Sequence, residues 1–380
     1  MACGTTRRAP VRDDAYPSPA LRVPAEAPRA SGALAGMPGT PSPQQSYRSR
    51  WIAASWSDVP GWQNDPMQDA WNAWLQNCER PGPLFGPLCQ DVRQLMLGSD
   101  NDRRLWMMGH LQPYRVESLE GVSDGLLTSY YEPLFDASAQ MRPGFEVPLY
   151  APPEGLAEAR RTGRPWFSRQ DIDTQPQARE ALRGRELAWL ADPIDALVLH
   201  IQGSGRVRMA NPDGTTRIVR LAFAGSNEQP YQSVGRWLLD RGLIRDASWP
   251  GIKAWIVSTQ QNNPRLVQEM LWSNPRYVFF REETRSAADA DLGPRGAQGV
   301  PLTAGRSIAV DKDSIPYGTP VWLASAGPNA NLQRLVFAQD TGSAIVGAVR
   351  ADYFAGTGAE AGDFAGRMKQ GLRLWVLWPK

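Results

Sequence analysis

The sequence predicts a mainly β protein with helices, of the α+β class, built from more than one domain. Across the last hundred residues, short apolar runs alternate with Gly, Pro and Asp turns, which is typical of a small closed β-barrel. Between residues 67 and 78, apolar residues recur at helical spacing instead. A chain of 380 residues is also long enough for two domains that each have a core.

The first 45 residues predict a disordered, Pro-rich tether. They contain eight Pro, with Ala, Arg and Ser between them, and no apolar periodicity. Cys3 follows a small residue near the start, as the lipidated Cys of a bacterial lipoprotein does. No apolar run approaches the length of a membrane span, so we expect membrane contact only through a lipid on Cys3.

Helices are expected in the next part of the chain. Asn64-Asp65-Pro66 predicts an N-cap followed by Pro at the first helical position. The apolar residues that follow at helical spacing predict a core-facing helix: Met67, Ala70, Trp71, Trp74, Leu75 and Cys78. One or two more helices are expected within residues 86–110. Cys78 and Cys89 fit either a disulfide in an oxidising compartment or two separate buried thiols.

Strands and helices are mixed in the middle of the chain, and strands dominate its end. Residues 125–131 and 277–280 predict strands, and three helices are expected at 231–244, 250–261 and 264–273. The short apolar runs expected to form the barrel strands are residues 307–310, 319–323, 335–338 and 372–377.

Composition excludes several functional classes. The formal net charge is +2 and is spread along the chain, which argues against a nucleic-acid binder. Only two His and three Cys are present, so we expect no metal site of the His/Cys kind. Gly203 and Gly205 supply a G-x-G, but Met209 and Ala210 stand where a dinucleotide fingerprint needs more glycine. We therefore expect no cofactor.

Asp340 is the candidate for acid/base chemistry. It ends the apolar run 335–338 and is followed by Thr341 and Gly342, so a rigid strand end would present its carboxyl among apolar neighbours. Desolvation there would raise its pKa, as a general acid at neutral pH requires. On these residues alone, a turn that the aspartate caps through an Asx-type hydrogen bond is favoured, because aspartates are common in turns.

Other polar groups are candidates for binding sugar. Residues 202–205, Gln-Gly-Ser-Gly, form either a loop whose Gln202 and Ser204 can bind a ligand or a plain linker. Tyr130 and Tyr131 point to opposite faces of a strand, so one belongs in the core while the other can stack on a ring. We take Tyr131 as the stacking candidate.

Together these segments resemble the membrane-bound lytic murein transglycosylase A family. The match is ordered and covers roughly residues 100–380; its pieces are residues 130–133, 192–193, 202–205, 274–280, 307–311, 315–319, 340–347, 356–358 and 361–362. The C-terminal part also resembles the three-aspartate domain, whose acidic triad maps to Asp311, Asp340 and Asp352. No single piece is decisive, and the signal comes from their order.

The resemblance implies a fold and a division into domains. It implies a double-psi β-barrel with a second β domain inserted into it and a groove between the two for glycan. Residues 46–130 would supply the helical part and the first barrel strand, 131–280 the inserted substrate-binding domain, and 281–380 the rest of the barrel.

The resemblance also implies an activity. The enzyme would cleave the β-1,4 bond between N-acetylmuramic acid and N-acetylglucosamine and leave a 1,6-anhydro ring, with Asp340 as its acid and then its base. Asp311 and Asp352 would support Asp340 or bind sugar hydroxyls. Two alternatives remain open on the sequence: a hydrolase that uses Asp340 with Asp311 or Asp352, and a wall-binding protein without activity.

Location and partners follow from the same resemblance. We expect a monomeric outer-membrane lipoprotein in the periplasm that acts on peptidoglycan glycan strands. Other cell-wall enzymes are candidate partners, and nucleic acid is not.

Overall fold

A computed structural model describes residues 48–210, 214–284 and 292–380. Cys3 and the predicted tether, residues 1–45, lie outside the described residues. Within the described part of the chain, no helix combines the length and the apolar character that crossing a membrane requires.

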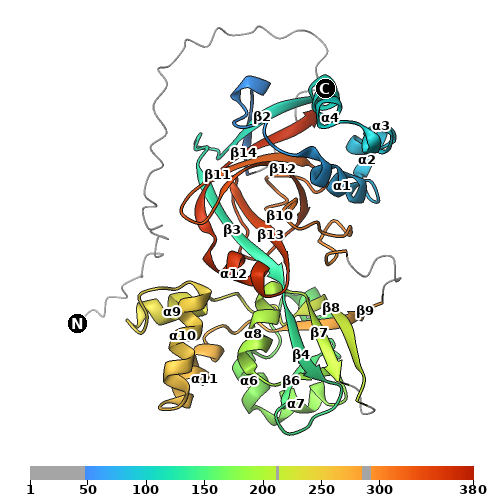
Figure 1. The fold of residues 1–380 in the computed structure, drawn as a ribbon. Coiled ribbons are helices and arrows are strands. Elements are labelled where there is room, and N and C mark those ends of the chain that lie inside the picture. Colours follow the sequence, from blue (N-terminus) through green and yellow to red (C-terminus); the bar gives the residue numbers. More distant parts are fainter. Residues whose placement is uncertain (1–47, 211–213, 285–291) are drawn as a thin grey trace, which may run out of the picture. The chain divides into compact units, whose positions relative to one another are not determined.

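Six strands close into a barrel, because β14 pairs with β11 on one side and with β3 on the other (Figure 1). Two of the pairings in this ring, β10 with β12 and β13 with β3, are parallel. The ring strands are β3 (Gly125–Glu132), β10 (Ser307–Val310), β11 (Pro320–Ala326), β12 (Asn331–Asp340), β13 (Arg350–Thr357) and β14 (Lys369–Pro379), and β2 (Leu111–Glu117) and β1 (Arg50–Ala53) extend the sheet from β14. The closed barrel that the sequence predicts is confirmed.

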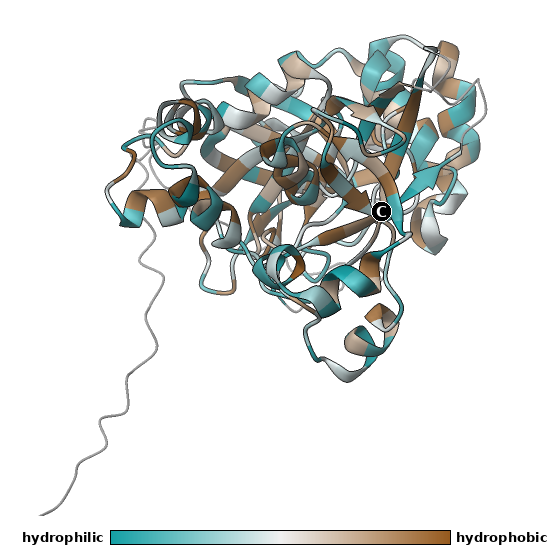
Figure 2. Ribbon diagram, turned by 90° about the horizontal axis from the view of Figure 1, so that it is seen from below, coloured by the Kyte–Doolittle hydropathy of each residue, from teal (hydrophilic) through white to brown (hydrophobic). Residues whose placement is uncertain are grey.

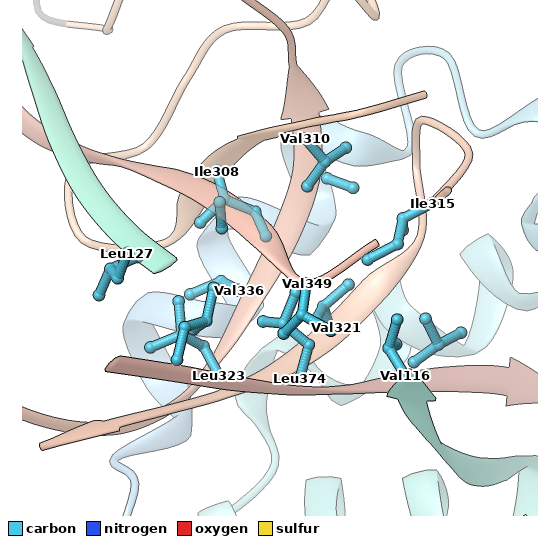
Figure 3. Packing of buried hydrophobic residues seen from close by; sticks show 14 of the residues in the cluster. Val116, Leu127, Ile308, Val310, Ile315, Val321, Leu323, Val336, Val349 and Leu374 are labelled. Atoms are coloured by element: carbon cyan, nitrogen blue, oxygen red, sulfur yellow. The ribbon is translucent and has the colours of Figure 1, made fainter. Parts of the chain in front are cut away.

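The barrel interior is filled by branched apolar side chains that come from nearly every strand of the ring. Figure 3 shows them packed against one another, among them Leu127, Ile308, Val336 and Leu374. Their burial removes apolar surface from water and fixes the inward face of each strand. The residues of alternate sequence position are thereby turned outward, some of them toward the site described below.

Helices near the N-terminus pack on the outside of the barrel. They are α1 (Met67–Asn77), α2 (Gly82–Phe85), α3 (Cys89–Gln94) and α4 (Asp100–His110). Trp71 and Trp74 of α1 are fully buried in a cluster that includes barrel residues, and the Trp74 ring lies 5.4 Å from that of Phe337. The predicted core-facing helix is confirmed. A disulfide bond of 1.99 Å joins Cys78, after α1, to Cys89 in α3.

The start of α1 differs from the sequence-based prediction. Pro66 occupies the N-cap position itself, so the helix begins one residue later than expected. Asp65 does not cap the helix, because both of its carboxylate oxygens accept from the buried Arg306 guanidinium, at 2.7 and 2.9 Å. It also accepts from the Leu335 N–H at 2.8 Å. The buried Arg306 guanidinium needs the Asp65 carboxylate more than the start of the helix does. The first N–H groups of a helix can hydrogen-bond to water instead.

A second, six-stranded sheet has the order β5-β6-β4-β7-β8-β9. Its strands are β4 (Leu134–Ser138), β5 (Val147–Tyr150), β6 (Glu186–Leu190), β7 (Gly205–Ala210), β8 (Thr216–Ser226) and β9 (Val278–Glu283). The helices of this part are α5 (Leu156–Thr162), α6 (Arg169–Thr174), α7 (Pro176–Leu182), α8 (Pro193–Gln202), α9 (Val234–Asp240), α10 (Trp249–Gln260) and α11 (Pro264–Trp272), and α12 (Ala359–Arg367) lies between β13 and β14. In Figure 2 the helices show both hydrophilic and hydrophobic residues, as expected for helices that bury one face.

The chain passes from the barrel into the second sheet where β3 ends and β4 begins (Figure 1). Glu132, the last residue of β3, is completely buried there. Its carboxylate accepts from Arg206 of β7 at 2.8 Å and from Arg220 of β8 at 2.7 Å. Two guanidinium groups therefore satisfy one buried carboxylate and join the end of a barrel strand to two strands of the second sheet.

Candidate active site

A cavity of about 690 Å³ is lined by residues of the barrel and of the second sheet. The barrel contributes two carboxyl groups, from Asp340 and Asp352. Around them lie polar and basic side chains from several elements; the lining residues used below are Arg80, Thr128, Tyr130, His200, Gln202, Ser204, Arg276, Arg281, Arg295 and Ala297.

Strand register brings the two aspartates into one cavity. The central strand β10 pairs with β12 on one side and with β13 on the other, and Ala309 is opposite Asp340 in the first pairing and Asp352 in the second. The backbones of the two aspartates are thus separated by two strand spacings, about 10 Å. This juxtaposition needs both pairings in their observed register.

The carboxyl group of Asp340 is held by donors that are distant in sequence. Tyr130 donates to Oδ2 at 2.8 Å, and the Ala297 N–H donates to Oδ1 at 2.9 Å. An Asx turn would instead use the N–H two residues further on. The geometry therefore favours the interpretation of Asp340 as a site residue over that of a turn cap.

The pKa of Asp340 is raised to about 6, chiefly because burial disfavours the charged form. Hydrogen bonds from Thr341, Tyr130 and Ala297 lower the pKa in part, and the charge of Asp352 raises it. A carboxyl group with this pKa is protonated in about a tenth of the molecules at pH 7, far more than at the usual value, and so can serve as a general acid.

Asp352 has a different set of partners. Its Oδ1 accepts from the Thr128 hydroxyl at 2.5 Å, and Arg350 in turn donates to the Thr128 oxygen at 2.8 Å. Burial raises the pKa of Asp352, while the Thr128 hydrogen bond and the Arg350 charge lower it. Asp352 is therefore positioned by its own hydrogen bonds and acts on Asp340 through its charge.

Asp311 does not line this cavity. Its Oδ2 accepts from Arg48 at 3.2 Å and from the Gly347 N–H at 2.9 Å, and its Oδ1 accepts from the Asp313 N–H at 3.0 Å. Because Gly347 lies in the segment between Asp340 and β13, this hydrogen bond ties the loop that follows Asp340 to Asp311. Of the three predicted aspartates, the structure brings Asp340 and Asp352 together and places Asp311 apart.

The predicted sugar-binding residues are divided between two cavities. Ser204 lines the large cavity, and Tyr131 lines a separate one of about 100 Å³ together with Trp249. Gln202 lines both, and its Oε1 accepts from the Tyr131 N–H at 3.1 Å. Tyr130, on the other face of the strand, is the tyrosine beside Asp340. Sequence reasoning did not assign it a role in the site.

The two histidines have different environments. His200 is buried and lines the large cavity; its Nδ1 accepts from Arg169 at 3.0 Å, and burial and the Arg169 charge lower its pKa well below the usual range. The imidazole is therefore neutral, with its proton on Nε2. His110 stacks on Trp106, away from the cavity. Among the described residues, no group of three or more His, Cys, Asp or Glu side chains is arranged to hold a metal ion.

Two family models match the chain. Residues 126–281 match the MltA specific insert domain, and residues 306–378 match the 3D domain. The first match covers most of the second sheet and its helices, and the second covers most of the barrel.

Known proteins match over most of the chain. A solved lytic transglycosylase, LtgG, of Burkholderia pseudomallei is 44% identical, with a TM-score of 0.60, over 88% of this chain and 97% of that one. Escherichia coli MltA, solved with bound chitohexaose, is 25% identical, with a TM-score of 0.69, over 88% of this chain and 95% of that one. The membrane-bound lytic murein transglycosylase A of Vibrio cholerae is 28% identical over 80% of this chain and 78% of its own length.

Proposed function

The chain belongs to the membrane-bound lytic murein transglycosylase A family and is a peptidoglycan lytic transglycosylase, and we propose that Asp340 is its single acid/base residue. The observation that supports this role is the raised pKa of a carboxyl group that two distant donors aim into the cavity. The bound chitohexaose of the Escherichia coli relative supports a glycan as the occupant.

In the proposed reaction, protonated Asp340 gives its proton to the oxygen that links N-acetylmuramic acid to N-acetylglucosamine, and the bond from the muramic C1 to that oxygen breaks. The carboxylate then takes the proton of the muramic C6 hydroxyl, whose oxygen bonds to C1. The products are a 1,6-anhydromuramic end and a free N-acetylglucosamine 4-hydroxyl, and Asp340 is protonated again.

One carboxylate is sufficient for these reaction steps because the nucleophile is part of the substrate. Most hydrolases need a second carboxylate to activate a water molecule or to act as the nucleophile. A hydroxyl that is part of the substrate is already in position, so this enzyme needs no such residue. Asp352 then adjusts the pKa of Asp340, and Asp311 supports the loop after Asp340. Sugar would be bound by Ser204 in the large cavity, by Tyr131 in the smaller one and by Gln202, which lines both.

Mass spectrometry of muropeptides released from purified sacculi tests the reaction. We expect products that end in 1,6-anhydromuramic acid, and at least about a 100-fold loss of them in Asp340→Asn. Asp313→Asn, which removes a carboxylate on the barrel outside the cavity, is the matched control and should keep full activity. Products heavier by one water would instead show a hydrolase, and near-normal activity of Asp340→Asn would refute the assignment.

We further propose that a lipid on Cys3 anchors the enzyme to the outer membrane, in the periplasm, where a monomer acts on peptidoglycan alone or beside other wall enzymes. The curated relatives are named membrane-bound lytic murein transglycosylase A, and this name supports an anchor. Membrane fractionation of the wild type and Cys3→Ser tests it: the wild type should sediment with membranes and the variant should not.

A further inference from the structure

The lining of the cavity contains both acidic and basic side chains. Asp340 and Asp352 lie on the barrel side, whereas four arginines line other parts: Arg80, Arg276, Arg281 and Arg295. Arg295 lies 3.4 Å from a Glu79 oxygen and 3.7 Å from a Glu283 oxygen, so its charge is compensated. Across the part of the chain that the structure describes, none of the other three guanidinium groups has a carboxylate within salt-bridge distance.

Arg276 is the most enclosed of these uncompensated cations. Its side chain is half-buried just before β9, whereas Arg80 and Arg281 are exposed. Burial lowers the pKa of Arg276, and the acid that opposes this effect, Glu228, is exposed and makes no ion pair with it. A guanidinium that has lost part of its hydration without gaining a carboxylate is costly to hold unless a ligand supplies the missing partner.

The backbone under Arg276 is fixed by buried hydrogen bonds. Arg169, which is almost fully buried, donates to the Arg276 carbonyl at 2.7 Å and to the Asn274 carbonyl at 3.1 Å. Asn227 donates to the Pro275 carbonyl at 2.9 Å. Three successive carbonyl groups are thereby held, so little backbone order remains to be created when a ligand binds Arg276.

The chemistry of the ligand follows from the guanidinium. Sugar hydroxyl and N-acetyl groups are neutral, whereas the planar fork of Arg matches a carboxylate with two parallel hydrogen bonds. In peptidoglycan, carboxylates belong to the muramic acid unit: either the free lactyl carboxylate of a peptide-free strand, or the carboxylates of a stem peptide attached there. N-acetylglucosamine carries none.

Resting on the proposed function, we propose that Arg276 binds a carboxylate carried by the muramic acid unit and thereby selects muramoyl glycan over neutral glycan. Arg80 and Arg281 add positive potential around the same cavity and favour the entry of an anionic strand. Arg276 is thus a specificity-determining residue that lines the same cavity as Asp340.

Equilibrium binding tests this role independently of cleavage. In an Asp340→Asn background, peptide-free glycan strands with free lactyl carboxylates are compared with the same strands after amidation by methylamine. We expect the parent to bind the acid at least about tenfold more tightly than the amide, and Arg276→Gln to lose that preference while it keeps its affinity for the amide. Arg217→Gln, on the same sheet but outside the cavity, should behave as the parent.

A parallel series with peptide-bearing strands, before and after amidation, distinguishes the two sources of carboxylate. A loss of preference confined to peptide-free strands assigns the lactyl group, and one confined to peptide-bearing strands assigns the stem peptide. A preference equal in Arg276→Gln and its parent in both series overturns the inference, as does an equal loss of affinity for acid and amide. Failure of the proposed function would appear elsewhere, as the absence of 1,6-anhydro products from the wild type.

Discussion

The Tyr130 hydroxyl donates to Oδ2 of Asp340 at 2.8 Å across 210 positions of sequence. The contact exists because β3 closes the barrel beside β13, which is itself two strands from β12. It stabilises the carboxylate form, so it opposes the effect of burial and helps to set the pKa of Asp340 at about 6. The acid form declines above that pH, and the rate of glycan cleavage should therefore fall as pH rises through it.

Tyr130→Phe removes a donor to the charged form of Asp340, so the pKa of Asp340 should rise further. We expect the alkaline limb of the pH profile of kcat/KM to move up by about one pH unit. The profile can be measured on soluble glycan strands, with Tyr131→Phe as the control, since the Tyr131 hydroxyl makes no hydrogen bond to Asp340. If the alkaline limb of the Tyr130→Phe profile lies at the same or a lower pH than that of the wild type, Tyr130 does not lower the pKa of Asp340.

Asp352→Asn should move the same limb in the opposite direction. The negative charge of Asp352 raises the pKa of Asp340, so a neutral amide that still accepts from Thr128 should lower it. We expect a downward shift of at most about one pH unit, together with lower activity at neutral pH, where less of the acid form remains. Glu282→Gln, which neutralises a carboxylate on the second sheet outside the cavity, is the control. An upward shift would show that Asp352 does not act on Asp340 through its charge.

Loss of the Cys78–Cys89 disulfide should destabilise the helical cover of the barrel. The bond closes a loop with a sequence separation of 11. Loop-closure entropy predicts a decrease of about 3 kcal/mol in the free energy of unfolding for the double Ser variant. Denaturant unfolding measures it, and a reducing agent should lower the stability of the wild type to that of the variant while leaving the variant unchanged.

Asp65→Ala should be strongly destabilising, because Asp65 is buried between the start of α1 and the barrel residue Arg306. It leaves the Arg306 guanidinium buried without its carboxylate and the Leu335 N–H without its acceptor. We expect a loss of about 3–5 kcal/mol in the free energy of unfolding. Asp58→Ala, which removes an exposed carboxylate nearby, should cost no more than about 1 kcal/mol. Equal effects of the two substitutions would show that the buried ion pair contributes little.

Local patterns in the sequence predicted many of the elements. The strand at residues 307–310 has the predicted bounds, because three buried apolar residues follow the buried Ser307 and stand between turn signals. The core-facing side of α1 was equally clear from its helical spacing. Two local signals misled. The helix predicted over residues 231–244 spans only Val234–Asp240. Asp65, whose short polar side chain next to Pro66 is typical of an N-cap, does not cap α1. Its partner, Arg306, lies 241 positions away, where no local pattern can indicate it.

The candidate site was only partly predictable for the same reason. Asp340 was a candidate from its place at the end of an apolar run, and the resemblance added Asp352. The alternation of Tyr130 and Tyr131 showed that only one of these tyrosines could share a face with either aspartate. Alternation cannot say which of the two tyrosines that is. It shows that their side chains lie on opposite faces of the strand, but not what each face contacts. The Ala297 N–H carried no signal that set it apart from any other backbone amide. Arg276 lies within residues 274–280, one of the pieces of the resemblance, but nothing in the sequence gave its guanidinium a role in the site.

The sequence by itself determined the closed-barrel class, the apolar segments that form its core and the acidic residue at the end of one strand. These follow from periodicity and from residues adjacent along the chain. Only the tertiary structure decided that Asp340 and Asp352 share a cavity, that Tyr130 rather than Tyr131 joins them, and that Asp311 supports a loop instead. Those relationships depend on strand register and on barrel closure, which hydrogen bonds between distant segments establish.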